Sequence, residues 1–152
     1  MSKRYSYRNL IVWQKAQDLV VDVVKLVENA PKTWANAVIV RQIVSSATSI
    51  SANIAEGHGR YASGAHRNHL SIARGSAAET DSWANTIMRL DWITVDEEQQ
   101  LHKQCNEIIA ILSSKMIKLE QEHNKNRTIS DQSAEYNVEH NLPFPFEETD
   151  FA

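Results

Sequence analysis

Six cationic or imidazole side chains fall within seventeen residues near the middle of the 152-residue chain. They are His58, Arg60, His66, Arg67, His69 and Arg74. Arginine offers planar paired donors to phosphate, and phosphate contacts supply affinity without base specificity. The cluster therefore predicts binding of phosphate or nucleic acid. Because Asp81 continues the helical edge of Arg67 and Arg74, a row of ion pairs between subunits is an equally good interpretation.

Metal binding is a weaker interpretation of the same residues. His66 and His69 are one helical turn apart, and His58 or Glu56 would have to supply a third ligand. Di-metal helical bundles use a Glu-x-x-His pair from each of two helices. This chain has one such match, ending at His123. We therefore expect no metal and no other cofactor.

No arrangement of residues points to catalysis. Gly57, Gly59 and Ala62 match the spacing of a dinucleotide-binding loop, but they follow a helical pattern instead of a strand. Cys105 lies on an apolar helical stripe, where cysteine is usually a small core residue. No serine has the sequence context of a nucleophile elbow. We expect a protein that is not an enzyme.

Four segments with helical periodicity position these residues, at about 10–29, 34–57, 63–90 and 95–123. Thr33 and Ser63 are predicted N-caps, and Gly57 is the predicted end of the second helix. Thr94 and Glu97 form a predicted capping box at the start of the fourth helix. Similar lengths and short connections favour an all-α fold, an antiparallel up-down four-helix bundle.

The third helix carries two apolar stripes. The first stripe shares one direction and is expected to face the core; it consists of Leu70, Ala73, Ala77, Ala84 and Met88. Ile72, Trp83 and Leu90 point about 120–140° away from it, at about 100° per residue. A second apolar stripe needs a second partner. We therefore predict that Ile72, Trp83 and Leu90 form the interface of a homo-oligomer.

The charge and composition change along the chain. Residues 1–123 hold 14 basic and 13 acidic side chains, whereas residues 124–152 hold two basic and six acidic ones. We expect a helical domain over 1–123, followed over 124–152 by an acidic linker and an irregular C-terminal tail. All three phenylalanines lie in that tail, Phe144, Phe146 and Phe151. It is either a docking peptide that inserts aromatic rings into a groove or a disordered acidic tail.

The sequence also bears on the cellular compartment. It has no run of about 18 apolar residues, so we expect no membrane partner. The first residues, MSKRYSYRN, lack the apolar segment of a signal peptide. A single cysteine suits a reducing compartment, which predicts a cytoplasmic location.

Two linked motifs resemble a known family. Residues 49–60 read SISANIAEGHGR, residues 70–79 read LSIARGSAAE, and residues 10–16 read LIVWQKA. Together they are similar to the four-helix proteins of the 23S rRNA intervening-sequence family. That fold group includes the accessory variability determinants of diversity-generating retroelements. The resemblance covers about residues 8–120, and its signature positions here are Asn53, Glu56, Gly57, Arg60, Gly75 and Glu79.

The signature residues have an architectural interpretation. We expect Arg60 to bridge Glu56 and Glu79, which would fix the turn between the second and third helices. Gly57 would give that turn its backbone freedom. Gly75 would let the third helix pack closely against a neighbour.

The resemblance implies a ring-shaped homo-oligomer, commonly a pentamer, with no known catalysis. In retroelements such proteins contact nucleic acid and a reverse transcriptase through basic surface. The sequence departs from the family pattern at one place, because Val44 and Ser45 follow Gln42-Ile43 where relatives often carry two arginines. This departure weakens the inference that the chain binds nucleic acid as those proteins do. Two functions therefore stay open. The first is a non-enzymatic scaffold or accessory protein that contacts RNA, DNA or a reverse transcriptase. The second is a purely protein-binding scaffold whose grooves take peptides, including its own tail.

Overall fold

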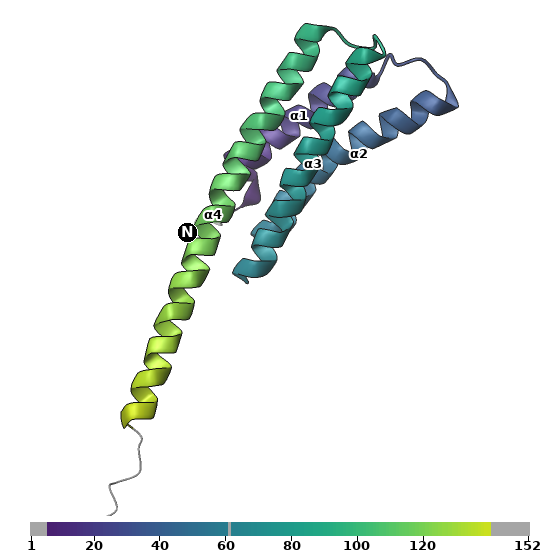
Figure 1. The fold of residues 1–152 in the computed structure, drawn as a ribbon. Coiled ribbons are helices and arrows are strands. Elements are labelled where there is room, and N and C mark those ends of the chain that lie inside the picture. Colours follow the sequence, from purple (N-terminus) through teal and green to yellow (C-terminus); the bar gives the residue numbers. More distant parts are fainter. Residues whose placement is uncertain (1–5, 61, 141–152) are drawn as a thin grey trace, which may run out of the picture. The chain divides into compact units, whose positions relative to one another are not determined.

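The computed structural model describes residues 6–60 and 62–140, with side chains up to residue 130 except that of residue 63. These residues form one 3-10 turn and four α-helices, with no strand among them, which confirms the all-α prediction (Figure 1). The elements are η1 (Tyr7–Asn9), α1 (Ile11–Val27), α2 (Trp34–His58), α3 (Ser63–Arg89) and α4 (Val95–His140). The chain divides into two compact units, Met1–Leu119 and Glu120–Ala152.

The helix starts follow local capping chemistry. The Thr33 side chain accepts a hydrogen bond from the Asn36 amide (3.2 Å), as predicted for the start of α2. At α4, the Glu97 amide donates to Thr94 Oγ1 (3.2 Å) and the Glu97 carboxylate accepts from the Thr94 amide (2.7 Å). This reciprocal pair is the predicted capping box. Ser63 was predicted as the cap of α3, but it is the first helical residue and Ala62 precedes it as the cap.

Two predicted helix ends differ from the structure. Gly57 lies inside α2, and Gly59 caps that helix in an ordinary right-handed backbone conformation. The helix α4 continues through His140, whereas we predicted a linker after residue 123. Residues 124–140 contain no glycine or proline, so nothing in them ends a helix once it has started. All side chains described in that stretch are exposed, which explains why no apolar stripe predicted it.

The core of the Met1–Leu119 unit is built from one apolar stripe on each helix. The α4 stripe is buried as predicted, from Leu101 through Cys105 to Leu119. On α2, the buried stripe consists of Ile43, Ala47, Ile50 and Ile54. On α3, the first predicted stripe is buried except for Met88, which packs against the core half-buried. The fully buried α1 residues are Ala16, Leu19 and Val23.

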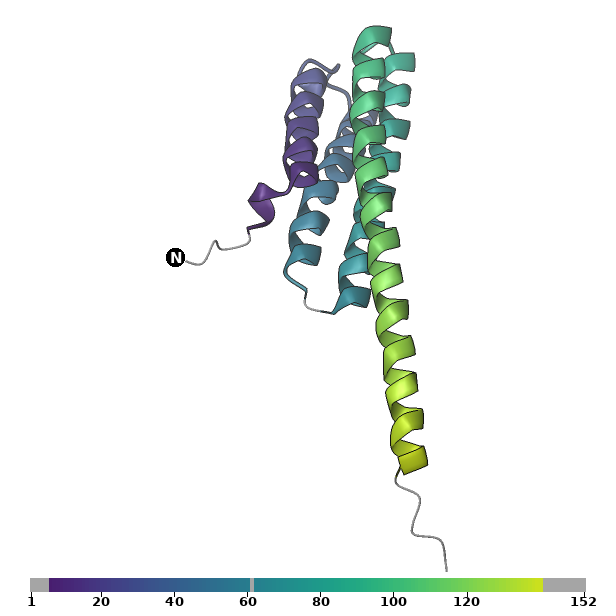
Figure 2. The same ribbon diagram turned by 90° about the vertical axis from the view of Figure 1, so that its left-hand side faces the viewer.

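Polar contacts register α4 against its neighbours. Lys15 of α1 pairs with Glu107 of α4 (Nζ–Oε2 2.8 Å), and the Gln104 amide donates to Asp22 (2.8 Å). Figure 2 shows these helices running side by side. These two contacts fix the register of α4 against α1.

Candidate nucleic-acid interface

Small hydroxyl side chains join α2 to α3. Ser76 Oγ donates to Ser49 Oγ (2.9 Å), and one turn further along Thr80 Oγ1 lies 3.0 Å from Ser46 Oγ. Each hydroxyl of the Ser46–Thr80 pair also bonds a carbonyl of its own helix. Their polar atoms are therefore satisfied although the side chains are buried. This hydroxyl ladder lets two helix backbones lie close together and explains the run of small residues in both motifs.

A second polar network continues the ladder toward the end of α2. Asn53 donates to the Ser49 carbonyl (2.9 Å), and its Oδ1 lies 3.1 Å from His69 Nδ1. The other ring nitrogen of His69 lies 3.7 Å from Glu56 Oε1. Arg60 pairs with the same carboxylate from one turn away. Because Arg60 donates to it and His69 lies nearby, the pKa of Glu56 is lowered.

The glycine at position 57 is required by this close packing. A Cβ on Gly57 would lie 2.9 Å from His69 Cβ and 3.3 Å from His66 Cδ2. Glycine therefore serves the approach of α3 and not the predicted backbone turn. By contrast, a Cβ on Gly75 would meet nothing within 4 Å, so the close packing predicted there does not occur within one chain.

The predicted bridge between Arg60 and Glu79 is absent. The Glu56 half of the bridge forms, but the Glu79 carboxylate accepts a hydrogen bond from Trp83 Nε1 (3.4 Å), one turn along its own helix. Glu79 lies on α3 more than two turns beyond the His69 network, which places it beyond the reach of Arg60.

The structure divides the six predicted phosphate-binding residues into three groups. Arg60 and His69 belong to the network around Glu56. His58 and His66 line one cavity together with Lys115 of α4. Arg67 and Arg74 are exposed on α3, and Arg74 Nη1 lies 3.5 Å from Ser113 Oγ of α4. Arg74 thus contacts α4 at Ser113, whereas His66 shares its cavity with Lys115.

Sequence reasoning missed Lys115 and Lys118. Both side chains are exposed, and their spacing of three residues makes them neighbours on the surface of α4. Lys115 lies about forty residues from the motif, and only the pairing of α3 with α4 brings it beside His66. The contact between Arg74 and Ser113 gives that pairing its register.

The protonation of His66 limits what it contributes. Burial lowers the pKa of His66, and the positive charge of Lys115 and the nearby His58 and His69 lower it further. A histidine ordinarily titrates near pH 6.5, so His66 is neutral at pH 7. His66 therefore adds no full positive charge to this surface at neutral pH.

Other chemistry has little support among the described residues. No group of three histidine, cysteine or acidic side chains there has the arrangement of a metal site. Cys105 is buried in the core, as predicted, and burial raises the pKa of its thiol to about 12. Such a thiol stays protonated and is a poor nucleophile.

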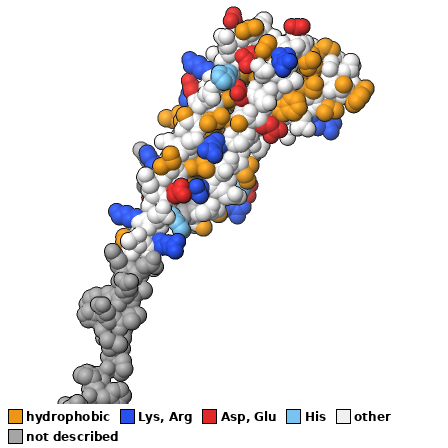
Figure 3. Space-filling model, in the orientation of Figure 1, with side chains coloured by type: hydrophobic (Ala, Val, Ile, Leu, Met, Phe, Trp, Pro, Cys, Tyr) orange, Lys and Arg blue, Asp and Glu red, His pale blue; other side chains and the backbone are white. Residues whose placement is uncertain are grey.

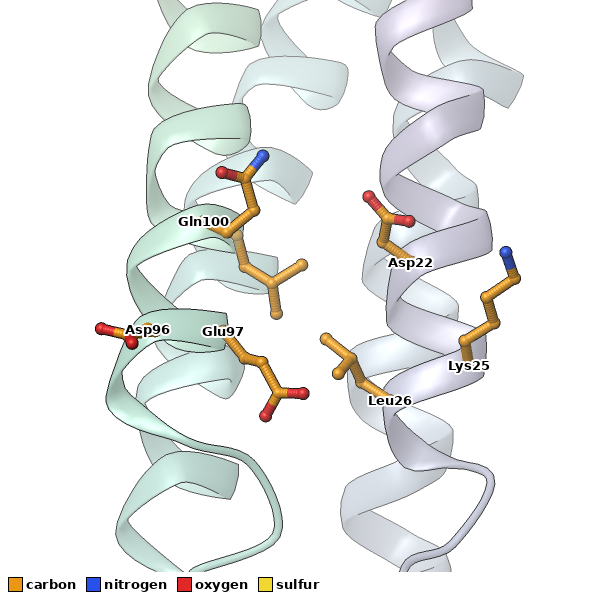
Figure 4. Close-up of a pocket in the computed structure, with 7 residues that line it drawn as sticks. Asp22, Lys25, Leu26, Asp96, Glu97 and Gln100 are labelled. Carbon is orange, nitrogen blue, oxygen red and sulfur yellow. The ribbon is translucent and has the colours of Figure 1, made fainter.

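A separate cavity of about 410 Å³ lies between the end of α1 and the start of α4. Figure 4 shows Asp22 and Lys25 on the α1 side, and Asp96, Glu97 and Gln100 on the α4 side. Three of its polar residues are acidic, and Glu97 is engaged in the capping box. This cavity does not suit a polyanion.

The predicted interface residues differ in exposure. Ile72 and Leu90 are each 44% exposed, whereas Trp83 is half-buried against the core. Sequence reasoning missed a larger apolar patch near the start of α2, where Trp34 is 84% and Val38 51% exposed. Figure 3 shows hydrophobic side chains gathered over this end of α2, which extends away from α3 in Figure 1. The clue was the run WANAVIV, which is apolar beyond the width of one helical stripe.

The predicted tail-docking residues Phe144, Phe146 and Phe151 lie outside the described residues. Within the described part of the chain, none of the helices combines the length and apolar character needed to cross a membrane.

The fold and site define a small all-α protein whose signature motif fastens α2 to α3 and whose α3–α4 edge is basic. Residues 8–114 match the family model of the 23S rRNA-intervening sequence protein, and the chain belongs to this family. A solved structure is similar to the chain, with 30% identity and a TM-score of 0.63 over 70% of this chain and 98% of the other. It is a protein of unknown function from the S23 ribosomal protein family of Bacteroides thetaiotaomicron. No functionally curated protein is detectably similar to the chain.

Proposed function

We propose that this protein is a non-enzymatic scaffold that binds structured RNA or DNA through the α3–α4 edge. The observation that carries the proposal is a set of basic side chains on α3 and α4. Arg67 and Arg74 are exposed on α3, where Arg74 lies against Ser113 of α4, and the exposed Lys115 of α4 lines a cavity with His66 of α3. The family's description, which links its members to 23S rRNA, supports RNA as the first ligand to test.

This site suits a phosphate backbone better than bases. Its cations are long exposed side chains, which can follow a phosphate backbone without contacting base edges. Phosphate contacts of this kind release counterions, so binding weakens steeply with salt. We therefore propose that the protein recognises the shape and charge of a nucleic acid. We also propose that it does so in the cytoplasm. A reverse transcriptase is a further proposed partner, suggested by the resemblance to retroelement accessory proteins.

The scaffold is proposed to be a ring. Four helices of the described lengths with short connections favour an antiparallel up-down bundle. Its exposed apolar residues on α2 and α3, which include Trp34, Val38 and Ile72, favour contact with further copies. We propose a homo-oligomer, a pentamer in line with the family resemblance, in which the basic edges repeat around the ring.

The test is salt-titrated binding to a structured RNA. We expect retention at about 50 mM salt, with an affinity that falls steeply as salt rises. Changing Arg67→Gln and Arg74→Gln together should weaken binding for all RNA sequences alike and reduce the salt slope by about two. Lys25→Gln, on α1 beside acidic residues, is the matched control and should change neither quantity. Absence of retention at low salt, or equal loss in the control, would contradict the proposal.

A purely protein-binding scaffold is the second candidate. The observation in its favour is the exposed apolar surface of α2, which carries no basic patch of its own beyond Arg41. It predicts oligomers that form normally and do not retain RNA at low salt.

A further inference from the structure

A cavity of about 640 Å³ opens where the beginning of α1 meets the end of α2, the beginning of α3 and the middle of α4. All of its lining residues belong to the Met1–Leu119 unit. Its volume lies within the range of about 300–1,000 Å³ that is typical of ligand pockets. The cavity is therefore large enough to bind a ligand.

The lining is apolar at the bottom and basic at the rim. Ile54, Leu70 and Leu112 form the buried part, and Leu10 to Val12 of α1 extend it to the surface, where Ile11 is 66% exposed. The polar lining residues are Asn9, His58, His66 and Lys115. Since none of the described lining residues is acidic, the cavity suits a ligand that is apolar at one part and anionic at another.

The chain contains a segment with this chemistry outside the described residues. Residues 141–152 read NLPFPFEETDFA, and they hold all three phenylalanines of the protein. Three carboxylates, Glu147, Glu148 and Asp150, follow directly after the Phe-Pro-Phe run. Pro143 and Pro145 restrict the backbone of the run before it binds, which reduces the entropy lost on docking.

We propose that this cavity binds residues 141–152 of a second copy, with Phe144 and Phe146 on the apolar floor and the carboxylates at the rim near Lys115. The aromatic rings supply buried area, and the acidic residues match a rim that has basic groups and no acid. The inference is independent of nucleic-acid binding, because its test contains no nucleic acid.

The experiment uses the full chain carrying Phe144→Ser and Phe146→Ser, so that its own tail does not compete. A fluorescein-labelled peptide of residues 141–152 is titrated into this variant and followed by anisotropy. We expect saturable binding, and at least tenfold weaker binding of a peptide in which both phenylalanines are serine. Loss of binding for the labelled wild-type peptide would overturn the proposal.

Matched surface variants locate the site. Lys115→Glu should weaken peptide binding about tenfold, whereas Lys118→Glu, one turn away and outside the lining, should change it less than twofold. Ile11→Ser should weaken it several-fold, and Ile117→Ser, similarly exposed on α4, should not. Because all four side chains are exposed, these variants are expected to fold. Equal effects within either pair would place the peptide elsewhere and overturn the assignment.

Discussion

The packing of α2 against α3 depends on a few side chains and on one glycine. Asn53, Glu56 and Arg60 were recognisable from the sequence as a linked set, and the structure joins them through His69. The role of His69 was not predictable as such, because a histidine in a basic cluster suggests phosphate binding. Only the approach of α3 at Gly57 shows that this ring instead fastens two helices.

Gly57→Ala tests the close approach. The added methyl group would lie 2.9 Å from His69 Cβ, so we expect a loss of about 1–3 kcal/mol in the free energy of unfolding, measured by denaturant titration. Gly75→Ala is the control, because its Cβ meets open space inside α3. It should leave the chain as stable or up to about 1 kcal/mol more stable. Equal free energies of unfolding for the two variants would contradict the close approach of α3 at Gly57.

The His102–Asp81 pair predicts a pH effect between α3 and α4. The hydrogen bond from His102 Nδ1 to Asp81 (2.8 Å) and the charge of Asp81 raise the pKa of His102 above its usual value. A raised histidine pKa stabilises the fold fully below the unfolded pKa of about 6.5, and this contribution is lost as pH rises through the folded pKa. NMR titration should show a raised pKa for His102 that falls in Asp81→Asn. An unchanged His102 pKa in that variant would show that Asp81 does not raise it.

At the scale of the helices, apolar periodicity and capping residues were enough to predict most of the fold. The α4 stripe and the Thr94–Glu97 capping box were readable because each follows from local spacing. The continuation of α4 beyond residue 123 was not, since its exposed residues form no stripe. Arg67 and Arg74 could be predicted as neighbours because they share one helix, whereas the position of Lys115 beside His66 follows only from tertiary packing.

The turn from α3 to α4 contains a further testable feature. Asp91 adopts a left-handed backbone conformation (φ 58°), and its amide and that of Trp92 close the helix end on the carbonyls of Met88 and Ile87. This is the Schellman arrangement, which glycine occupies at least strain. Asp91→Gly should therefore raise the free energy of unfolding by about 0.5–1 kcal/mol in thermal or denaturant melts. Asp91→Ala should give no gain, and a gain of equal size there would contradict the backbone explanation.

At the scale of the whole molecule, the exposed apolar residues are the basis for the proposed assembly of several copies. Trp34 is 84% exposed and Ile72 44%, and they lie on different helices of the same unit. A chain that left these surfaces in water would carry an aggregation risk, so we propose that copies cover them. The repeated basic edges would then act together in one assembly, which increases avidity for a long polyanion.

Light scattering on the purified full chain over a wide concentration range tests this assembly most directly. We predict a mass several times that of one chain at all but the lowest concentrations, five times for the proposed pentamer. The variant Ile72→Asp with Trp34→Ser should shift the mass toward one chain while helical circular dichroism is retained. A wild-type protein that keeps the mass of a single chain up to millimolar concentration would contradict the account.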